Sequence, residues 1–94
     1  MHLQHFVEYI RDVRGVSESS LRSYVGALHT INTLLEKYHF AIPNLFLTTG
    51  IDELDEIRSF LERNAEFQEK DATGHRMYSV AFKHYYRFSL WYKN

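Results

Sequence analysis

Apolar residues recur at helical spacing along most of the chain, and the pattern is clearest between Gly74 and Asn94. At about 100° per residue, the large apolar side chains of this segment fall on one broad arc. They are Met77, Tyr78, Ala81, Phe82, Tyr85, Phe88 and Tyr92. Arg76, Lys83 and Arg87 fall on the opposite side, and the segment contains no acidic residue. We therefore expect a closing helix with an aromatic face toward the core and a cationic face toward solvent.

Two further helices are predicted before residue 39. A stripe of apolar residues, Leu3, Phe6, Val7, Ile10 and Val13, predicts a helix over about residues 2–14, which Gly15 ends. Ser17 is a favoured N-cap, because its hydroxyl accepts a free backbone N–H, and it opens a helix that reaches Tyr38. The apolar face of that second helix is Leu21, Tyr24, Val25, Leu28, Ile31, Leu35 and Tyr38.

The opposite face of the second helix is polar and includes a glycine. Its polar residues are Arg22, His29, Thr33 and Lys37. Gly26, in mid-helix on the same face, costs up to about 1 kcal/mol relative to Ala. It either allows another backbone to approach closely or is a tolerated accident, and the sequence leaves both interpretations open.

The middle of the chain changes pattern twice. Residues 39–50 include Pro43 and Gly50, which predict a connector whose apolar side chains fill the core, with one short turn around residues 44–47. Helical spacing returns from Ile51 to Asn64. Residues 64–74 are interpreted as a lead into the closing helix, with Phe67 as a core contact and Asp71 or Thr73 as a cap.

These segments predict an all-α fold of four principal helices in a compact orthogonal or bundle-like array, without strands. The length of 94 residues suits one domain, and seven Phe, seven Tyr and one Trp supply its core. The expected core residues are Leu21, Tyr24, Leu28, Ile31, Ile57, Phe60, Ala81, Tyr85 and Phe88.

Several kinds of protein are excluded by what the sequence lacks. Without cysteine there is no disulfide, zinc–thiolate site or cysteine nucleophile, and we expect a reducing cytoplasm. No apolar run is long enough to span a membrane, and the first residues do not resemble a signal peptide.

Candidate catalytic and metal sites are weak. His2 and His5 lack a third metal ligand, and His84 is expected to be packed and hydrogen-bonded. The four carboxylates at residues 52–56 suit the positive end of a helix. Because no phosphate-binding loop or activated nucleophile is present, we expect no metal, no cofactor and no catalysis by this chain.

The formal net charge of −1 is unlike that of a dedicated nucleic-acid binder. However, the charges are segregated along the chain. Residues 1–50 hold four basic and four acidic residues, residues 51–74 hold three and eight, and residues 75–94 hold four and none. The charge pattern by itself allows either ordinary surface charge or a basic interface in the last segment.

Two stretches resemble a known family. GVSESSLRSYVGALHTINTLL, from Gly15 to Leu35, resembles the second helix of the core-binding domain of tyrosine recombinases (phage integrases). The residues that carry the likeness are Ser17, Ser20, Leu21 and Tyr24. TGHRMYSVAFKHYYRFSL resembles the closing helix of the same domain through Ser79, Ala81, Tyr85, Tyr86 and Phe88. Residues 64–79 are also similar to the helical domain that precedes some restriction-type nucleases.

The first resemblance implies a SAM-like four-helix domain that binds duplex DNA beside a separate catalytic domain. In that family an Arg, a His-x-x-Arg and a nucleophilic Tyr lie in the following domain, so none is assigned here. Residues 1–94 are accordingly expected to be one DNA-binding-type domain, a fragment of a larger protein that lacks its catalytic domain.

The segregated charge and the resemblance together predict contacts with double-stranded DNA. The residues expected to contact it are Arg22, His29, Lys37, Arg76, Lys83 and Arg87, provided that the second and closing helices are neighbours. A C-terminal catalytic domain and other protomers on the DNA are the further expected partners. The alternative is a protein-interaction module, with an exposed apolar patch around Leu90, Trp91 and Tyr92.

Overall fold

The first helical segment consists of two kinds of helix in series. In the computed structural model, which describes residues 2–42 and 44–93, α1 (Leu3–Glu8) continues directly into a π-helix, η1 (Tyr9–Val13). The wider turn is visible in the hydrogen bonds, because the Arg14 N–H donates to the carbonyl of Tyr9 at 3.1 Å. Gly15 then adopts a φ of 65°, the left-handed conformation that ends the segment. The predicted helix over residues 2–14 is therefore confirmed, with a π-turn that its spacing did not reveal.

The second helix, α2 (Glu18–Lys37), begins where its cap predicted. The Ser17 hydroxyl oxygen accepts a hydrogen bond from the Ser20 N–H at 3.2 Å. The buried face of α2 consists of Leu21, Ala27, Leu28, Ile31, Leu34 and Leu35. Gly26 is exposed, and a Cβ built on it would meet nothing within 4 Å. Among the described residues no other backbone approaches Gly26, which favours the second interpretation, a tolerated glycine.

The connector after α2 fills the core, as predicted, around a single 3₁₀ turn, η2 (Leu45–Leu47). Leu45 and Phe46 are fully buried. The turn is fixed to α2 through Asn32, whose side-chain oxygen accepts from the Leu45 N–H at 2.6 Å. Asn44 caps η2 by accepting from the Phe46 N–H at 2.9 Å. Pro43, which the sequence analysis used to place this connector, lies outside the described residues.

The prediction of four helices missed one. After α3 (Ile51–Arg63), a further helix, α4 (Ala65–Thr73), occupies the stretch interpreted as a lead into the closing helix. Asn64 caps α4 by accepting from the Phe67 N–H at 2.8 Å. Phe67 and Asp71 are its only buried residues, so α4 has too few apolar positions to produce a helical period.

The last helix, α5 (Met77–Lys93), is joined to α4 by a tight corner. His75 and Arg76 both have positive φ, at 54° and 63°. The corner is held by Asp71, whose buried carboxylate accepts from the Ser79 N–H at 2.9 Å and from the Ser79 hydroxyl. The expectation that Asp71 caps the closing helix is thus confirmed, although Asp71 lies in the preceding helix.

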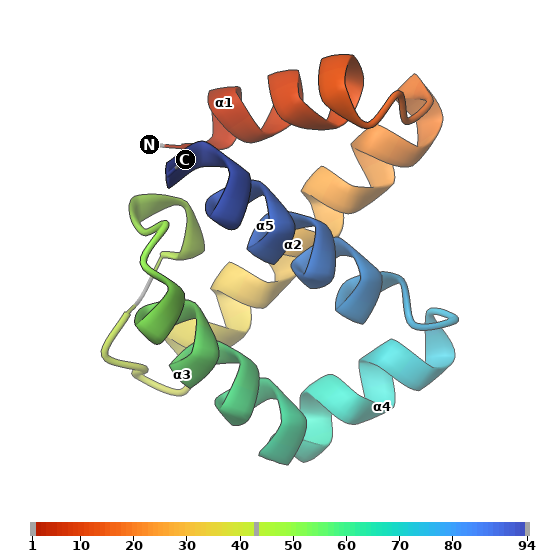
Figure 1. Ribbon diagram of the computed structural model, residues 1–94. Coiled ribbons are helices and arrows are strands. Elements are labelled where there is room, and N and C mark those ends of the chain that lie inside the picture. The colour runs from red at the N-terminus through yellow and green to blue at the C-terminus, as the bar shows by residue number, and fades with distance from the viewer. Residues whose placement is uncertain (1, 43, 94) are drawn as a thin grey trace.

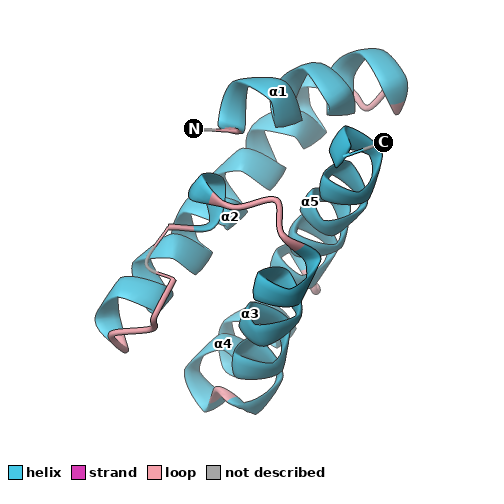
Figure 2. Cartoon of the chain, turned by 60° about the vertical axis from the view of Figure 1, so that its left-hand side comes forward, coloured by secondary structure: helices cyan, strands magenta, loops and turns pink. Residues whose placement is uncertain are grey.

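The helix α5 is the central element of the molecule (Figure 1). Its contact with α2 is the most extensive contact between any two elements of the described chain. It also contacts η1, α3 and α4. Figure 2 shows α2 on one side of the core and α3, α4 and α5 on the other. The largest buried side chains are aromatic, and Phe6 lies 5.4 Å from Tyr85 and 5.7 Å from Phe88 between ring centroids. Every described element is helical, so the predicted all-α class is confirmed.

Most of the predicted core is buried, with two corrections. Tyr24 and Phe60 are only partly buried, whereas Tyr85 and Phe88 are completely enclosed. Tyr24 lies at the edge of the α2–α5 contact against the His84 ring, and Phe60 packs at another edge against Tyr38 and Phe40. In the described part of the chain, no helix is long and apolar enough to cross a membrane.

Candidate nucleic-acid interface

The outer face of α5 carries cations that are in no ion pair with another described residue. Ala81, Tyr85 and Phe88 are fully buried and fix which side of α5 faces the core. Lys83 and Arg87, four residues apart on the opposite side, are therefore directed outward, and both are exposed. Within the described residues neither has an ion-pair partner, and α5 contains no acidic residue.

Arg14 adds a third charge to this surface from another element. It is the C-cap of η1, is exposed, and has no ion-pair partner among the residues described. Its charge acts on His84 of α5 together with those of Arg87 and Lys83. We call Arg14, Lys83 and Arg87 the α5 cation cluster. The sequence analysis missed Arg14, because its place in this cluster depends on the packing of η1 against α5.

His84 is the residue on which all three charges of the α5 cation cluster act. Its ring packs against the ring of Tyr24 with centroids 4.8 Å apart. Burial, and then the nearby charges of Arg14, Arg87 and Lys83, lower the pKa of His84 below its ordinary value of 6.5. The ring is packed as expected, but the predicted hydrogen bond is absent, because the buried Nδ1 has no partner in the part of the chain that the structure describes.

Arg76 does not share the helical face assigned to it. It lies one residue before α5, in the left-handed turn, with its N–H donating to the Asp71 carbonyl at 2.6 Å. The prediction extended the α5 period one turn too far toward the N-terminus. Arg76 is exposed, but its backbone position is set by the corner between α4 and α5.

The cations predicted on α2 are separated from those on α5. The apolar faces of α2 and α5 pack against each other, so the polar faces of the two helices point apart. The two helices are neighbours, as the prediction required, but their cations do not form one surface. Arg22 is exposed on the outer face of α2. Lys37 is paired with Glu66 of α4 at 2.7 Å, and the His29 ring lies 5.3 Å from the Phe46 ring.

Two more cations, besides Lys37, are paired with carboxylates. Arg11 pairs with Glu18 at 2.7 Å. Arg58 pairs with Asp55 at 2.8 Å and lies over the Tyr86 ring. Arg22, Arg63, Lys70 and Arg76 are exposed and, like the α5 cation cluster, have no ion-pair partner among the described residues. The α5 cation cluster differs from them in that it combines charges from two elements and includes two cations on a helix without acidic residues.

The acidic start of α3 is used within the fold. Asp55 accepts hydrogen bonds from Arg58 and from the Tyr86 hydroxyl, the latter at 2.9 Å, and this contact raises the pKa of Tyr86. Glu53 accepts from the Thr48 hydroxyl at 2.6 Å. Over residues 2–42 and 44–93, no three His, Asp or Glu residues are grouped to hold a metal ion.

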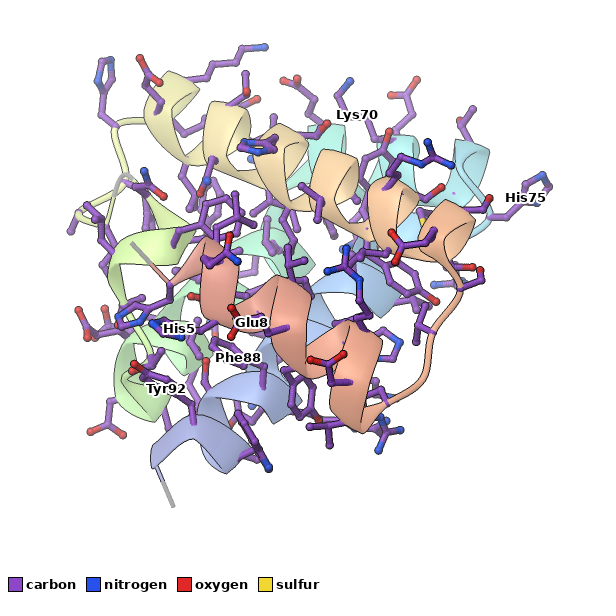
Figure 3. The ribbon with its side chains drawn as sticks, turned by 90° about the horizontal axis from the view of Figure 1, so that it is seen from above. His5, Glu8, Lys70, His75, Phe88 and Tyr92 are labelled. Carbon is purple, nitrogen blue, oxygen red and sulfur yellow. The ribbon has the colours of Figure 1, made fainter. Side chains whose placement is uncertain are left out.

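A second surface, at the end of α5, is apolar. Val13 is 52 % exposed and Trp91 is 49 % exposed, and both line a groove of about 570 Å³ between η1 and α5. In Figure 3, His5 and Glu8 of α1 lie at the same end of the molecule as Phe88 and Tyr92 of α5, far from His75 and Lys70. The His5 and Tyr92 rings are 5.2 Å apart. This groove contains Trp91 and Tyr92 of the apolar patch that the alternative interpretation predicted, whereas Leu90 is exposed on another side of α5, beside α3 and α4.

Comparison with known protein families gives a match along nearly the whole chain. Residues 3–93 match the family described as phage integrase, N-terminal SAM-like domain. Comparisons with curated proteins and with solved structures found no match. The matched domain is the N-terminal module of integrases and not their catalytic domain, in agreement with the absence of assigned catalytic residues. The chain therefore belongs to the phage integrase N-terminal SAM-like domain family.

Proposed function

We propose that this domain binds duplex DNA through the α5 cation cluster and so positions the DNA for a separate catalytic domain. The observation that carries the proposal is the outer face of α5, where Lys83 and Arg87 have no carboxylate partner among the described residues and Arg14 lies nearby. Cations of this kind bind phosphate oxygens and release condensed counterions, which provides affinity without reading sequence.

The geometry of the cluster suits a phosphate backbone. Lys83 and Arg87 are separated by about 6 Å along the helix axis, since each residue of an α-helix rises about 1.5 Å. Arg14 approaches from the end of η1, so the three charges are not confined to one line. The net charge of −1 opposes long-range attraction, and binding should therefore depend on close contact and weaken steeply with salt.

The test is a salt titration of duplex binding by fluorescence anisotropy, between about 50 and 200 mM salt, where phosphate contacts are strongly attenuated. The variant Lys83→Gln/Arg87→Gln should bind more weakly and should reduce the slope of log K against log salt by about 1.8, because each phosphate contact contributes about 0.9. Thermal melts should remain close to the parent, since both side chains are exposed.

The matched control is Arg63→Gln/Lys70→Gln, which removes the same charge from exposed positions on α3 and α4. It should leave the slope nearly unchanged, and Arg22→Gln/His29→Gln on the outer face of α2 should do the same. Equal binding by the α5 variant and the parent would reject the proposed interface. An absence of parent binding at about 50 mM salt, where electrostatic contacts are still strong, would reject DNA binding itself.

A second candidate function, contact with another protein, is favoured by the apolar groove at the end of α5. Trp91 and Val13 expose large apolar areas there, beside the acidic side chains of Glu8 and Asp12. Exposed apolar surface of this kind is typical of protein contacts. If the parent fails to bind duplex DNA, this groove becomes the principal candidate site.

A further inference from the structure

We propose that His84 is an additional phosphate ligand of this interface, donating its Nε2–H to the DNA backbone as a neutral imidazole. The proposal rests on the DNA-binding function proposed above and deepens it. It assigns a directional contact to a residue that is neither a permanent cation nor part of the outer face of α5.

The environment of the ring determines which nitrogen carries the proton. The Nδ1 atom is enclosed and has no hydrogen-bond partner among the described residues, whereas Nε2 is not enclosed in this way. A proton on Nδ1 would place a donor in a buried position without an acceptor, which is unfavourable. The tautomer with the proton on Nε2 leaves an unpaired acceptor at Nδ1 instead, which proteins tolerate somewhat better than an unpaired buried N–H. This tautomer also directs its donor toward the accessible side of the ring.

Burial and the nearby positive charges keep the His84 ring neutral. Burial lowers the pKa of His84 most, followed by the charges of Arg14 at the end of η1 and of Arg87 and Lys83 on α5. The contact from α2 is the ring of Tyr24, and no carboxylate of the described residues acts on His84 to favour the imidazolium. At pH 7.5 the ring is therefore an uncharged donor on which the charges of three cations act.

A neutral donor differs from a cation in a measurable way. Lysine and arginine release counterions when they bind phosphate, so they contribute to the salt dependence of binding. A neutral N–H releases none and adds only its hydrogen bond. Because the ring is held against Tyr24, its N–H has a fixed direction, unlike the flexible cations around it. His84 should therefore add affinity without changing the salt slope.

The experiment compares the parent with His84→Phe, which keeps a ring against Tyr24 and removes both nitrogens. Duplex binding is measured by fluorescence anisotropy at pH 7.5 over about 50–200 mM salt, the range in which phosphate contacts weaken measurably. We expect affinity to fall by roughly tenfold at every salt concentration, as for the loss of one hydrogen bond to a charged group, with an unchanged slope. The control is His29→Phe on the outer face of α2, which should bind like the parent.

A second measurement uses the parent protein alone, so it does not depend on how the variant folds. NMR correlation of the imidazole nitrogens at pH 7.5 should show His84 with the proton on Nε2, and addition of duplex DNA should shift that resonance. Protonation on Nδ1, parent-like binding by His84→Phe, or a flatter salt slope in that variant would each overturn the inference. Failure of the parent to bind DNA would be recognised separately, and would overturn the proposed function together with this inference.

Discussion

At the scale of single residues, two glycines have opposite roles in the backbone. Gly26 occupies an exposed α2 position with free space around it, so Gly26→Ala should stabilise the fold by about 0.5–1 kcal/mol by restricting the unfolded chain. Gly15 has a φ of 65°, so Gly15→Ala should destabilise it by about 1–2 kcal/mol. Urea denaturation of the two variants measures both changes. A loss of stability in Gly26→Ala would contradict the interpretation that Gly26 is a tolerated glycine with open space around it.

The candidate interface shows which residues a sequence can place. Lys83 and Arg87 were predicted together because they are one turn apart within a single helix, and a helical period determines their common face. Arg76 was misplaced because two consecutive residues of positive φ interrupt that period just before α5. Arg14 could not be predicted, since only the packing of η1 against α5 brings its charge close to His84.

At the scale of elements, α4 depends on a single aromatic anchor. Phe67 is its only buried apolar side chain. Phe67→Ala should therefore cost about 3 kcal/mol and speed amide hydrogen exchange over residues 65–73 more than elsewhere. Glu69→Ala, an exposed position in the same helix, should change neither by much. Uniform exchange across all helices in Phe67→Ala would show instead that α4 unfolds only together with the whole domain.

The sequence predicted the longer elements and missed the short one for the same reason. Apolar residues recur over several turns in α2 and α5, so their period is clear. In α4 two buried residues, one of them the carboxylate of Asp71, cannot establish a period. The local signals available were Asn64 as a cap and Glu66 in the first turn, and these indicate a helix start without its length.

At the scale of the whole molecule, the histidines make stability depend on pH. Burial lowers the pKa of His84 and of His2 in the folded state. The unfolded chain, with ordinary pKa values near 6.5, then binds more protons as the pH falls. The contribution of these two histidines to the free energy of unfolding is thus complete above about pH 6.5, and it is lost progressively as the pH falls below that value. We expect Tm to fall between pH 7.5 and 5.5, and to fall less in His84→Phe than in the parent.

The comparison for this pH effect is between His84→Phe and the parent, with thermal melts at both ends of that pH range. If Tm falls equally in His84→Phe and in the parent, His84 does not contribute to the pH dependence of stability. The ion-paired carboxylates Glu18 and Glu66, whose pKa values are lowered by Arg11 and Lys37, should affect stability only at more acidic pH.

The central position of α5 has a consequence for how the protein is made. The aromatic core is completed by contacts between the first helix and the last, as in the pairs Phe6–Tyr85 and Phe6–Phe88. A ribosome releases α5 after every other described element, and nascent chains fold as whole domains. Chains that end before residue 85 should therefore expose α2 and remain sensitive to proteases. For this domain, the native state becomes accessible only after most of its own translation is finished.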